Sequence, residues 1–382
     1  MHHDVPPEIG ELLDGVRAFV EHEVLPLEGE HHALAAADEV TPEFYELCRQ
    51  VQRRSVEAGY HAMFMPEDVG GAGLGEFEMC LVRELISSYG SRLCMLMLGD
   101  LPFGPNRMLH ALGTEYQREK FLLPLVRGEV TTAIALSEPD AGSDLTHIMT
   151  SARRAEGGWV LNGTKCFITN GPFADFLQVL ARDEDAGGHS MFLVERDAYR
   201  VGSIQHSMAG DDFQAEIVFA DSFVPEANVV GEPGGAFDYA LRFLSNERLA
   251  MASVAIGMAE HALRLAKEYA RQRVTFGKPL IKHQAIAWMI ADSETELYAA
   301  RAMTHDAARR ADAGEEIFRE ISMAKLFASE MVGRVVDRAV QIHGGMGYMR
   351  DSTVERLYRL ARVLRIAGGS SEIQRMIIAS SA

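Results

Sequence analysis

WVLNGTKCFITN, residues 159–170, decides the fold, because its pattern differs from the helical pattern on either side of it. Its apolar residues alternate with polar ones or run together, as they do in β-strands. Asn162-Gly163 and Glu156-Gly157-Gly158 each favour a hairpin turn with positive φ. Three similar runs follow: DFLQVLAR (175–182), SMFLVE (190–195) and AEIVFADSFVP (215–225). The sequence therefore predicts a β domain over residues 131–232.

The remaining residues have the apolar spacing of helices. No proline follows Pro279, and apolar residues in the tail recur three and four positions apart. Residues 237–272 have the same character, so residues 233–382 are predicted to form an antiparallel bundle of about four helices. An N-terminal helical domain is predicted over residues 1–130. Its expected helices are 9–24, 42–58, 76–90, 102–112 and 114–126. The predicted fold class is α+β, mainly α.

Charge and cysteine usage exclude several classes of protein. The 37 Lys and Arg against 55 Asp and Glu give a net charge of −18, which repels nucleic acids and anionic lipid surfaces. Cys48, Cys80, Cys94 and Cys166 have no repeated spacing, so we expect neither disulfides nor a metal site. The longest apolar stretch, 249–259, is about half of the roughly 20 residues that a bilayer span needs. We expect a cytoplasmic protein without membrane insertion.

Familiar short catalytic motifs are missing from the sequence. It contains no HExxH, no GxSxG, no GxxxxGK[ST] and no GxGxxG between a strand and a helix. Gly, Ser and Thr clusters remain at the edges of the β segment and along the C-terminal helices. This composition suits a bulky ligand with phosphate groups held by backbone donors.

Seven motifs, in this order along the chain, resemble those of the acyl-CoA dehydrogenase family. They are MPEDVGGAGLG (65–75), ALSEPDAGSD (135–144), LNGTKCFITNG (161–171), IVFADSFVP (217–225), RQRVTFGKPLIKHQ (271–284), VQIHGGMGYMRDSTVERLYR (340–359) and SSEIQR (370–375). The resemblance covers nearly the whole chain. It implies an N-terminal helical domain, a barrel-like middle β domain and a C-terminal four-helix bundle. It also implies an FAD enzyme, a homotetramer, that oxidises an acyl-CoA to its trans-2-enoyl form and passes electrons to an electron-transferring flavoprotein.

The resemblance also implies which residues contact FAD. Those expected to face the isoalloxazine ring are Leu136, Ser137, Ile168 and Thr169. Those expected to hold the pyrophosphate and adenosine from the neighbouring subunit are Arg273, Phe276, Gln284, Gln341 and Gly345. Ser370 and Glu372 are expected to contact FAD as well.

The catalytic base departs from the commonest pattern of the family. Most members carry an EGT triplet before the SEIQR-like run, but this chain has Gly368 at the Glu position and Ala367 in place of an aromatic residue. A minority, including isovaleryl-CoA and long-chain acyl-CoA dehydrogenases, carries its Glu on the first helix of the bundle, directly before an Arg. Glu247 and Arg248 match that pattern, so we expect Glu247 to be the base. The backbone N–H of Gly368 is expected to bind the thioester oxygen.

The expected substrate-binding residues are Ser143, Ser245 and Arg248. Small residues at 367 and 368 favour a branched or a medium to long acyl group. The loop 207–216 lacks the Arg, Ser and Thr of the family, so some flavin or interdomain contacts are expected to differ. Alternatives of the same fold are an acyl-thioester oxidase, a flavin monooxygenase and a dehydrogenase of carrier-protein thioesters. A catalytically degenerate subunit of a hetero-oligomer is the non-enzymatic alternative.

Overall fold

The computed structural model describes residues 7–37, 39–100, 103–210 and 213–380, without the side chains of residues 241–246. The chain divides into two compact units. The helical unit comprises Met1–Ala36, Gly75–Cys94 and Leu244–Ala382, and the β unit comprises Ala37–Leu74 and Met95–Phe243. The predicted segment 1–130 thus contributes to both units, and its boundaries stay a prediction. The mainly α fold with one sheet-containing part is confirmed.

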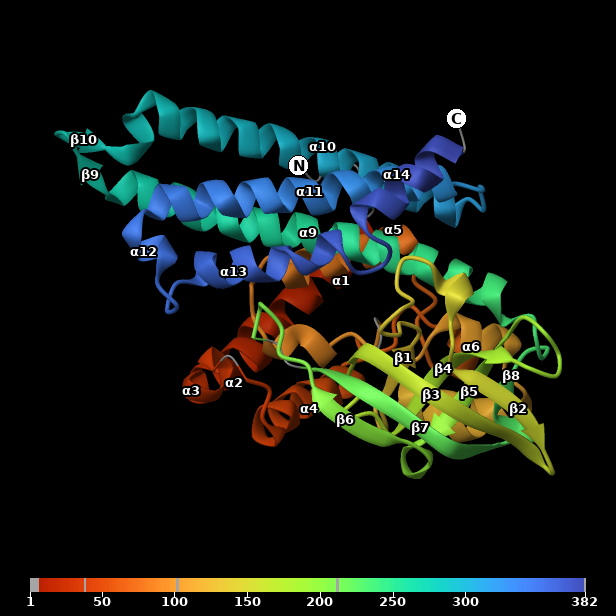
Figure 1. The fold of residues 1–382 in the computed structure, drawn as a ribbon. Coiled ribbons are helices and arrows are strands. Elements are labelled where there is room, and N and C mark those ends of the chain that lie inside the picture. The colour runs from red at the N-terminus through yellow and green to blue at the C-terminus, as the bar shows by residue number, and fades with distance from the viewer. Residues whose placement is uncertain (1–6, 38, 101–102, 211–212, 381–382) are drawn as a thin grey trace. The chain divides into compact units, whose positions relative to one another are not determined.

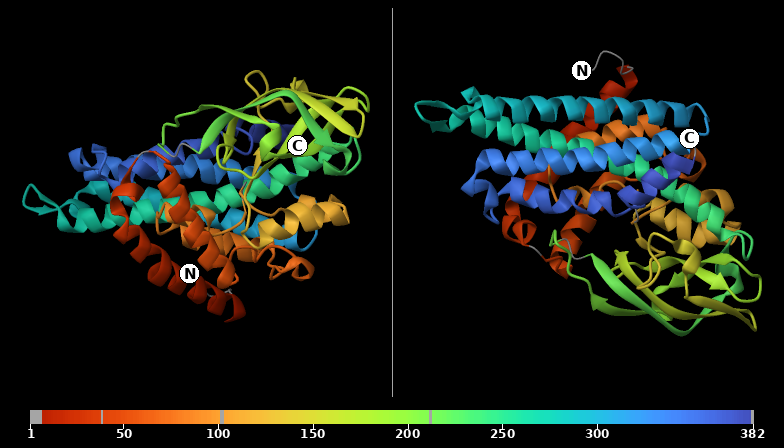
Figure 2. Two further views of the ribbon diagram at one scale, coloured as in Figure 1. Left: turned by 90° about the horizontal axis from the view of Figure 1, so that it is seen from below. Right: turned by 45° about the horizontal axis from the view of Figure 1, so that its top comes forward.

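Long helices form the bundle of the helical unit and lie side by side in Figures 1 and 2. They are α9 (Ala236–Gln272), α10 (Gln284–Asp312), α11 (Phe318–His343), α13 (Thr353–Ala361) and α14 (Ser371–Ser380). The unit also contains α1 (Pro7–Phe19), α2 (Leu25–Glu30), α3 (His32–Ala36), α5 (Glu76–Ser87) and the short α12 (Gly345–Tyr348). Small alanines of α9, among them Ala252, Ala255 and Ala259, pack in its core. They allow close helix approach.

Helix α9 contains a long apolar segment. Its segment Glu247–Gln272 is long and apolar enough to cross a membrane by composition, but 72% of the apolar window is buried inside the structure. The helix also crosses α5 closely, because a Cβ on Gly257 would lie 2.3 Å from the carbonyl oxygen of Glu84. These contacts are those of a core helix in a packed protein.

Helix α5 follows Gly75, which has no side chain to cap the first turn, and its own Glu78 accepts the Gly75 N–H, at 2.6 Å. Asp312, at the end of α10, accepts hydrogen bonds from the backbone N–H groups of Glu76 at 2.6 Å and Phe77 at 2.9 Å. A Cβ on Gly75 would lie 2.8 Å from the Asp312 carboxyl group, so a glycine there leaves room for the cap. The carboxylate supplies the acceptors that the first turn of a helix lacks.

The β unit contains one eight-stranded sheet (Figure 1). Its strands are β1 (Thr132–Ala135), β2 (Ser151–Ala155), β3 (Gly158–Thr169), β4 (Phe176–Asp183), β5 (His189–Glu195), β6 (Arg200–Ile204), β7 (Gln214–Pro225) and β8 (Val229–Val230). The order is β6-β7-β3-β2-β4-β5-β8, with β1 paired to β4. The four predicted strand runs are confirmed as β3, β4, β5 and β7. Their alternating apolar residues fill a core around Trp159 and Phe192.

One predicted hairpin is confirmed and the other is wrong. Gly157 has φ +78° in the turn that joins β2 to β3. Asn162-Gly163 instead lies inside β3, where the pairing with β7 changes register. A Cβ on Gly163 would lie 2.7 Å from the Cα of Thr150. The glycine therefore permits a close approach of two backbone segments, which is a common reason for glycine within a strand.

Helices α4 (Pro42–Glu57), α6 (Arg107–Leu112), α7 (Glu115–Gln117) and α8 (Leu123–Val126) also belong to the β unit. The Thr41 hydroxyl caps α4, and Pro42 occupies its first turn. Helix α6 is shorter than the predicted 102–112, because the side chain of Asn106 caps it by accepting the Leu109 N–H at 2.8 Å.

All four cysteines are buried free thiols. Cys48 and Cys166 lie in the β unit, and Cys80 and Cys94 lie in the helical unit. Burial raises the pKa of Cys80 and of Cys94 to about 12. Their thiolate forms are therefore scarce at neutral pH.

Candidate active site at the Gly368–Gly369 turn

Gly368 and Gly369 form a tight turn between α13 and α14. Their φ angles are +64° and +89°, a left-handed conformation that glycine adopts at little cost. A Cβ on Gly368 would lie 2.7 Å from the Sδ of Met251 on α9. The backbone of the turn therefore packs directly against α9.

The contact on α9 is made by neighbours of Glu247. Arg248 donates from Nε to the carbonyl oxygen of Gly368 at 3.3 Å. Met251 follows Glu247 by four residues, so the two lie on one face of the helix. Glu247 is half-buried. The structure thus brings Arg248 and Met251, neighbours of Glu247 on α9, into contact with Gly368, which is far from them in sequence.

Lys325 on α11 and Gln374 on α14 complete the contacts of the turn. Lys325 Nζ donates to the Gly369 carbonyl at 2.7 Å, and Gln374 Nε2 donates to the carbonyls of Gly368 at 3.2 Å and Gly369 at 2.9 Å. Both side chains are fully buried. Sequence reasoning missed them. The sequence did offer one signal: Lys325 occupies a position that helical spacing assigns to the apolar face of α11.

The turn is surrounded by positive charge. Burial and the nearby Arg248 charge together lower the pKa of Lys325 to about 8, although Glu372 acts in the opposite direction. Burial also lowers the pKa of Arg248. Both groups still carry charge at neutral pH. They place two positive charges beside the turn in a chain whose net charge is −18.

Ser370 and Glu372, expected at FAD, lie at the start of α14. The Ser370 hydroxyl accepts the Ile373 N–H at 3.4 Å. The pKa of Glu372 is below its usual range because its own backbone N–H and the Ser370 hydroxyl stabilise the carboxylate. Two buried polar atoms here, Ser371 Oγ and Gln374 Oε1, find no hydrogen-bond partner among the described residues. A polar ligand would satisfy them. Ser245 lies in α9, but its side chain is outside the described residues.

A second group of predicted residues meets at the opposite end of the bundle, by the hairpin β9 (Val274–Thr275) and β10 (Lys278–Pro279) (Figures 1 and 2). These residues are exposed: Arg273, Phe276, Gln284, Gln341 and Gly345. Tyr269 stacks on His343 with ring centroids 4.5 Å apart, which ties the end of α9 to the end of α11. In the part of the chain that the structure describes, the exposed Arg273 guanidinium has no side-chain partner, and the Phe276 ring is 97% exposed. A guanidinium suits a pyrophosphate, and an exposed aromatic ring suits an adenine. This donor set fits the adenosine half of FAD.

In the β unit, the residues expected at the flavin ring follow β1 and end β3. Leu136, Ser137 and Thr169 are half-buried, whereas the Ile168 side chain belongs to the core of the unit. Ser143 is exposed. Loop 207–216 is described except for residues 211 and 212.

A buried ion pair fixes the loop after β1. Lys165 Nζ lies 2.8 Å from Glu138 Oε1 and donates to the Leu136 carbonyl at 2.9 Å. The Glu138 carboxylate also accepts the N–H groups of Met149 at 2.6 Å and Thr150 at 2.9 Å. Burial lowers the pKa of Lys165 to about 8. Burial raises the pKa of Glu138, but Lys165 and the N–H donors outweigh it and hold the value below the usual range. This pair was not anticipated from the sequence.

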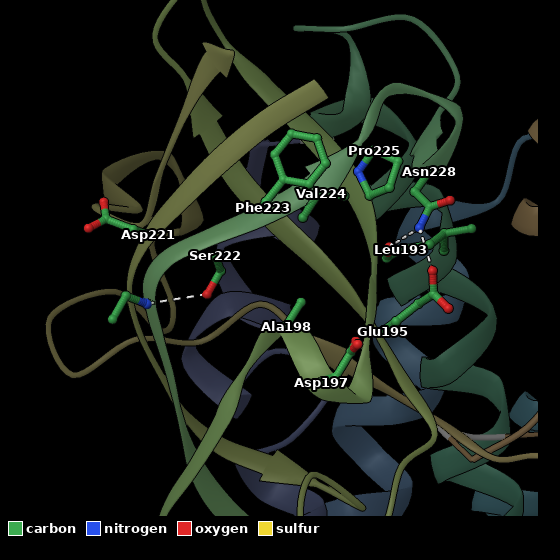
Figure 3. Close-up of a pocket in the computed structure, with 11 residues that line it drawn as sticks. Leu193, Glu195, Asp197, Ala198, Asp221, Ser222, Phe223, Val224, Pro225 and Asn228 are labelled. Atoms are coloured by element: carbon green, nitrogen blue, oxygen red, sulfur yellow. Dashed lines mark hydrogen bonds between the residues drawn. The ribbon is translucent and has the colours of Figure 1, made fainter. Parts of the chain in front are cut away.

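Figure 3 shows a separate hollow of the β unit with a volume of about 460 Å³. It lies beside β5 and β7, and its acidic lining side chains are Glu195, Asp197 and Asp221. It contains none of the expected site residues. Within the described ranges, no group of three His, Cys, Asp or Glu residues is placed to hold a metal ion.

Family models and known proteins match nearly the whole chain. Family models of the acyl-CoA dehydrogenase N-terminal, middle and C-terminal domains match residues 6–129, 133–222 and 234–382. A 3-(aryl)acrylate reductase of Clostridium sporogenes is 36% identical over 96% of both chains. A caffeyl-CoA reductase–Etf complex subunit of Acetobacterium woodii is 35% identical over 87% of this chain and 89% of that protein. The crystal structure of an acyl-CoA dehydrogenase from Geobacillus kaustophilus has a TM-score of 0.90 and 31% identity, and the match covers 99% of both chains.

Three domain matches in the expected order cover most of the chain. The family is FAD-dependent, and the exposed donors at the hairpin end and the unpartnered atoms near α14 fit that cofactor. The chain belongs to the acyl-CoA dehydrogenase family of oxidoreductases, which act on CH–CH groups.

Proposed function

We propose that this protein oxidises an acyl-CoA to its trans-2-enoyl form, with Glu247 as the base that removes the α proton. The observation that carries the proposal is the contact between Met251 and Gly368, because it faces the Glu247 side of α9 toward the turn. Position 368 carries no carboxylate, and in this proposal Glu247, on the helix that faces the turn, supplies it. The missing Glu at position 368 and the Glu at position 247 are therefore expected to compensate for each other.

The chain's own groups divide the work of proton removal. The half-buried Glu247 carboxylate takes the weakly acidic proton next to the thioester carbonyl. The Gly368 N–H donates to the thioester oxygen and stabilises the negative charge that develops there. FAD, when bound, accepts the hydride from the β carbon. The residues expected at FAD keep those roles in this proposal, with Arg273 and Phe276 reaching the FAD of a neighbouring subunit.

The proposed substrate is a branched or a medium to long acyl-CoA. Ala367 and Gly368 leave little side-chain bulk at the turn, and the flexible thioether of Met251 borders Gly368. A methionine side chain adapts to differently shaped neighbours. Ser143, Ser245 and Arg248 are the proposed substrate-side residues.

The proposed assembly is a cytoplasmic homotetramer that passes electrons to an electron-transferring flavoprotein. Large apolar side chains exposed in the helical unit support an interface between copies of the chain: Phe276, Trp288, Tyr298, Met346 and Tyr348. The name of the Acetobacterium woodii relative supports the flavoprotein partner. Sedimentation of Trp288→Ser against wild type tests the interface, and an unchanged assembly mass would count against it.

The testing experiment is anaerobic. The FAD-loaded protein is titrated with straight and branched acyl-CoAs while the visible flavin absorbance is recorded. We expect one class to bleach the flavin, and Glu247→Gln to slow the bleaching roughly a hundredfold or more while FAD stays bound. Glu268→Gln is the matched control, because Glu268 is an exposed carboxylate on the same helix, paired with Arg264.

Bleaching at the wild-type rate in Glu247→Gln would remove Glu247 from the mechanism. Flavin that no acyl-CoA reduces would favour a carrier-protein thioester, and re-oxidation by oxygen in each turnover would favour an oxidase. A protein that binds no FAD would favour a degenerate subunit.

Two relatives named reductases support a second candidate, in which the same groups reduce an enoyl thioester. Turnover from chemically reduced flavin and an enoyl-CoA distinguishes that direction.

A further inference from the structure

Two buried cations hold the Gly368–Gly369 turn from the side of the bundle core. Arg248 is 6% exposed and Lys325 is 0% exposed. In the described part of the chain, each donates to a turn carbonyl, and neither pairs with a carboxylate. Burying a cation without an anion is costly, and an apolar side chain of similar length would pack there at lower cost. The two cations therefore indicate a local need for positive charge.

The hydrogen bonds to the carbonyls of Gly368 and Gly369 fix the direction of the next N–H group in each peptide. In a trans peptide the C=O and N–H groups point in opposite directions. Because Arg248 and Lys325 hold the carbonyls of Gly368 and Gly369, the N–H groups of Gly369 and Ser370 point away from these cations. Among the described residues, the N–H groups of Gly368, Gly369 and Ser370 have no acceptor. The turn therefore presents free donors.

We infer that Lys325 is a positioning residue for α-proton removal: its bond to the Gly369 carbonyl, together with the Arg248 bond to Gly368, holds the two left-handed residues of the turn and so keeps the Gly368 N–H, at the start of the turn, directed at the thioester oxygen. The inference rests on the proposed function, in which the Gly368 N–H binds that oxygen. Lys325 itself does not touch the substrate. It acts through the peptide groups of the turn.

A cation suits this position for two reasons. A charged donor makes a shorter and stronger hydrogen bond than a neutral one, which helps to hold two consecutive left-handed residues. The charge also favours negative charge on the thioester oxygen, against the field of a chain with net charge −18. Both effects favour the state in which the α proton has left.

The experiment measures α-proton removal alone. The probe is an acyl-CoA analogue with sulfur in place of the 3-methylene group, which can lose its α proton but cannot donate a hydride. NMR follows exchange of its α protons for solvent deuterium on the holoenzyme. Lys325→Met is compared with Lys325→Arg, which keeps the charge. Ser329→Ala is the control, because Ser329 is buried one turn further along α11 and bonds to the Leu326 carbonyl.

We expect Lys325→Met to slow exchange about tenfold or more, part of the hundredfold or greater effect of removing an oxyanion donor outright. The dissociation constant of the analogue should stay close to wild type, Lys325→Arg should restore part of the rate, and Ser329→Ala should have no effect. A wild-type rate per FAD-loaded site in Lys325→Met would overturn the inference, even if its melting temperature fell, because the role would then be structural.

Two further variants keep the test decisive. If Lys325→Met does not fold, Lys325→Gln and Arg248→Lys weaken the same carbonyl contacts, and wild-type exchange in both would overturn the inference. Glu247→Gln separates the inference from the proposed function. Normal exchange in Glu247→Gln would refute the proposed base, whereas normal exchange in the Lys325 variants would refute the positioning role alone.

Discussion

Replacing Lys165 with methionine in the β unit would leave the Glu138 carboxylate buried without its cation. Lys165 is fully buried, and its Nζ lies 2.8 Å from Glu138 Oε1. Removing one partner of a buried pair typically costs about 3–5 kcal/mol of unfolding free energy. The pKa of Lys165, about 8 against the usual 10.5, indicates a cost of about 3 kcal/mol for keeping the ammonium charged there. The pair as a whole therefore stabilises less than the loss of one partner suggests.

The double variant tests this reasoning. Lys165→Met with Glu138→Gln removes both charges but keeps an amide oxygen for the N–H groups of Met149 and Thr150. We expect the double variant to recover about 2 kcal/mol relative to Lys165→Met.

The assay is urea unfolding followed by the fluorescence of Trp159, which is buried in the β unit, in a Trp288→Phe background. A loss below about 1 kcal/mol in Lys165→Met, or a double variant less stable than the single one, would refute the argument.

The same pair predicts a pH dependence of stability. The folded-state pKa of Lys165 lies below its unfolded value, so between pH 8 and 10.5 the unfolded chain binds a proton that the folded chain lacks. The stability of the β unit should therefore rise with pH across this window. The Lys165→Met variant should lack this rise, which urea midpoints measured at successive pH values would show.

Two predictions concern the helical unit, and denaturation followed by circular dichroism checks both. Gly257→Ala should lose about 2 kcal/mol, because its Cβ would meet the Glu84 carbonyl oxygen at 2.3 Å and force α5 and α9 apart. Gly333→Ala is the control, with nothing within 4 Å of the added atom, and it should gain up to about 1 kcal/mol. Asp312→Ala should lose about 1–2 kcal/mol, because two N–H groups at the start of α5 lose their acceptor. Equal stability of Gly257→Ala and Gly333→Ala, or of Asp312→Ala and wild type, would contradict these contacts.

Local patterns predicted the strands well. The predicted strand 175–182 is observed as Phe176–Asp183, because alternation and apolar runs reflect burial on a sheet directly. The hairpin turn predicted at Asn162-Gly163 was wrong, because a contact with another segment of the chain outweighed the local preference. The local preference of this dipeptide is for a turn, but the neighbouring backbone at Thr150 makes a close approach that requires glycine within a strand. That constraint comes from a contact between segments, which the local pattern does not contain.

The candidate site also contains residues that the sequence could identify and residues that it could not. Glu247 and Gly368 could be singled out by comparison with a family pattern, but the spacing of residues in this sequence does not place them together. Residue type alone did not single out Lys325 or Lys165, because lysine is normally exposed; only the position of Lys325 on the apolar face of its helix gave a signal. Their burial is visible in the folded chain, where each ammonium group meets backbone carbonyls and, for Lys165, a carboxylate.

The buried thiols allow local opening of the structure to be measured by chemical labelling. Each unit holds two of them, Cys48 and Cys166 in one and Cys80 and Cys94 in the other. A thiol reagent can react with these groups only when the surrounding structure opens transiently, so the labelling rate measures the free energy of that opening. Mass spectrometry of peptides from the labelled protein would report the two units separately. The effect of FAD or an acyl-CoA on each unit could then be followed in the natural sequence, without an added probe.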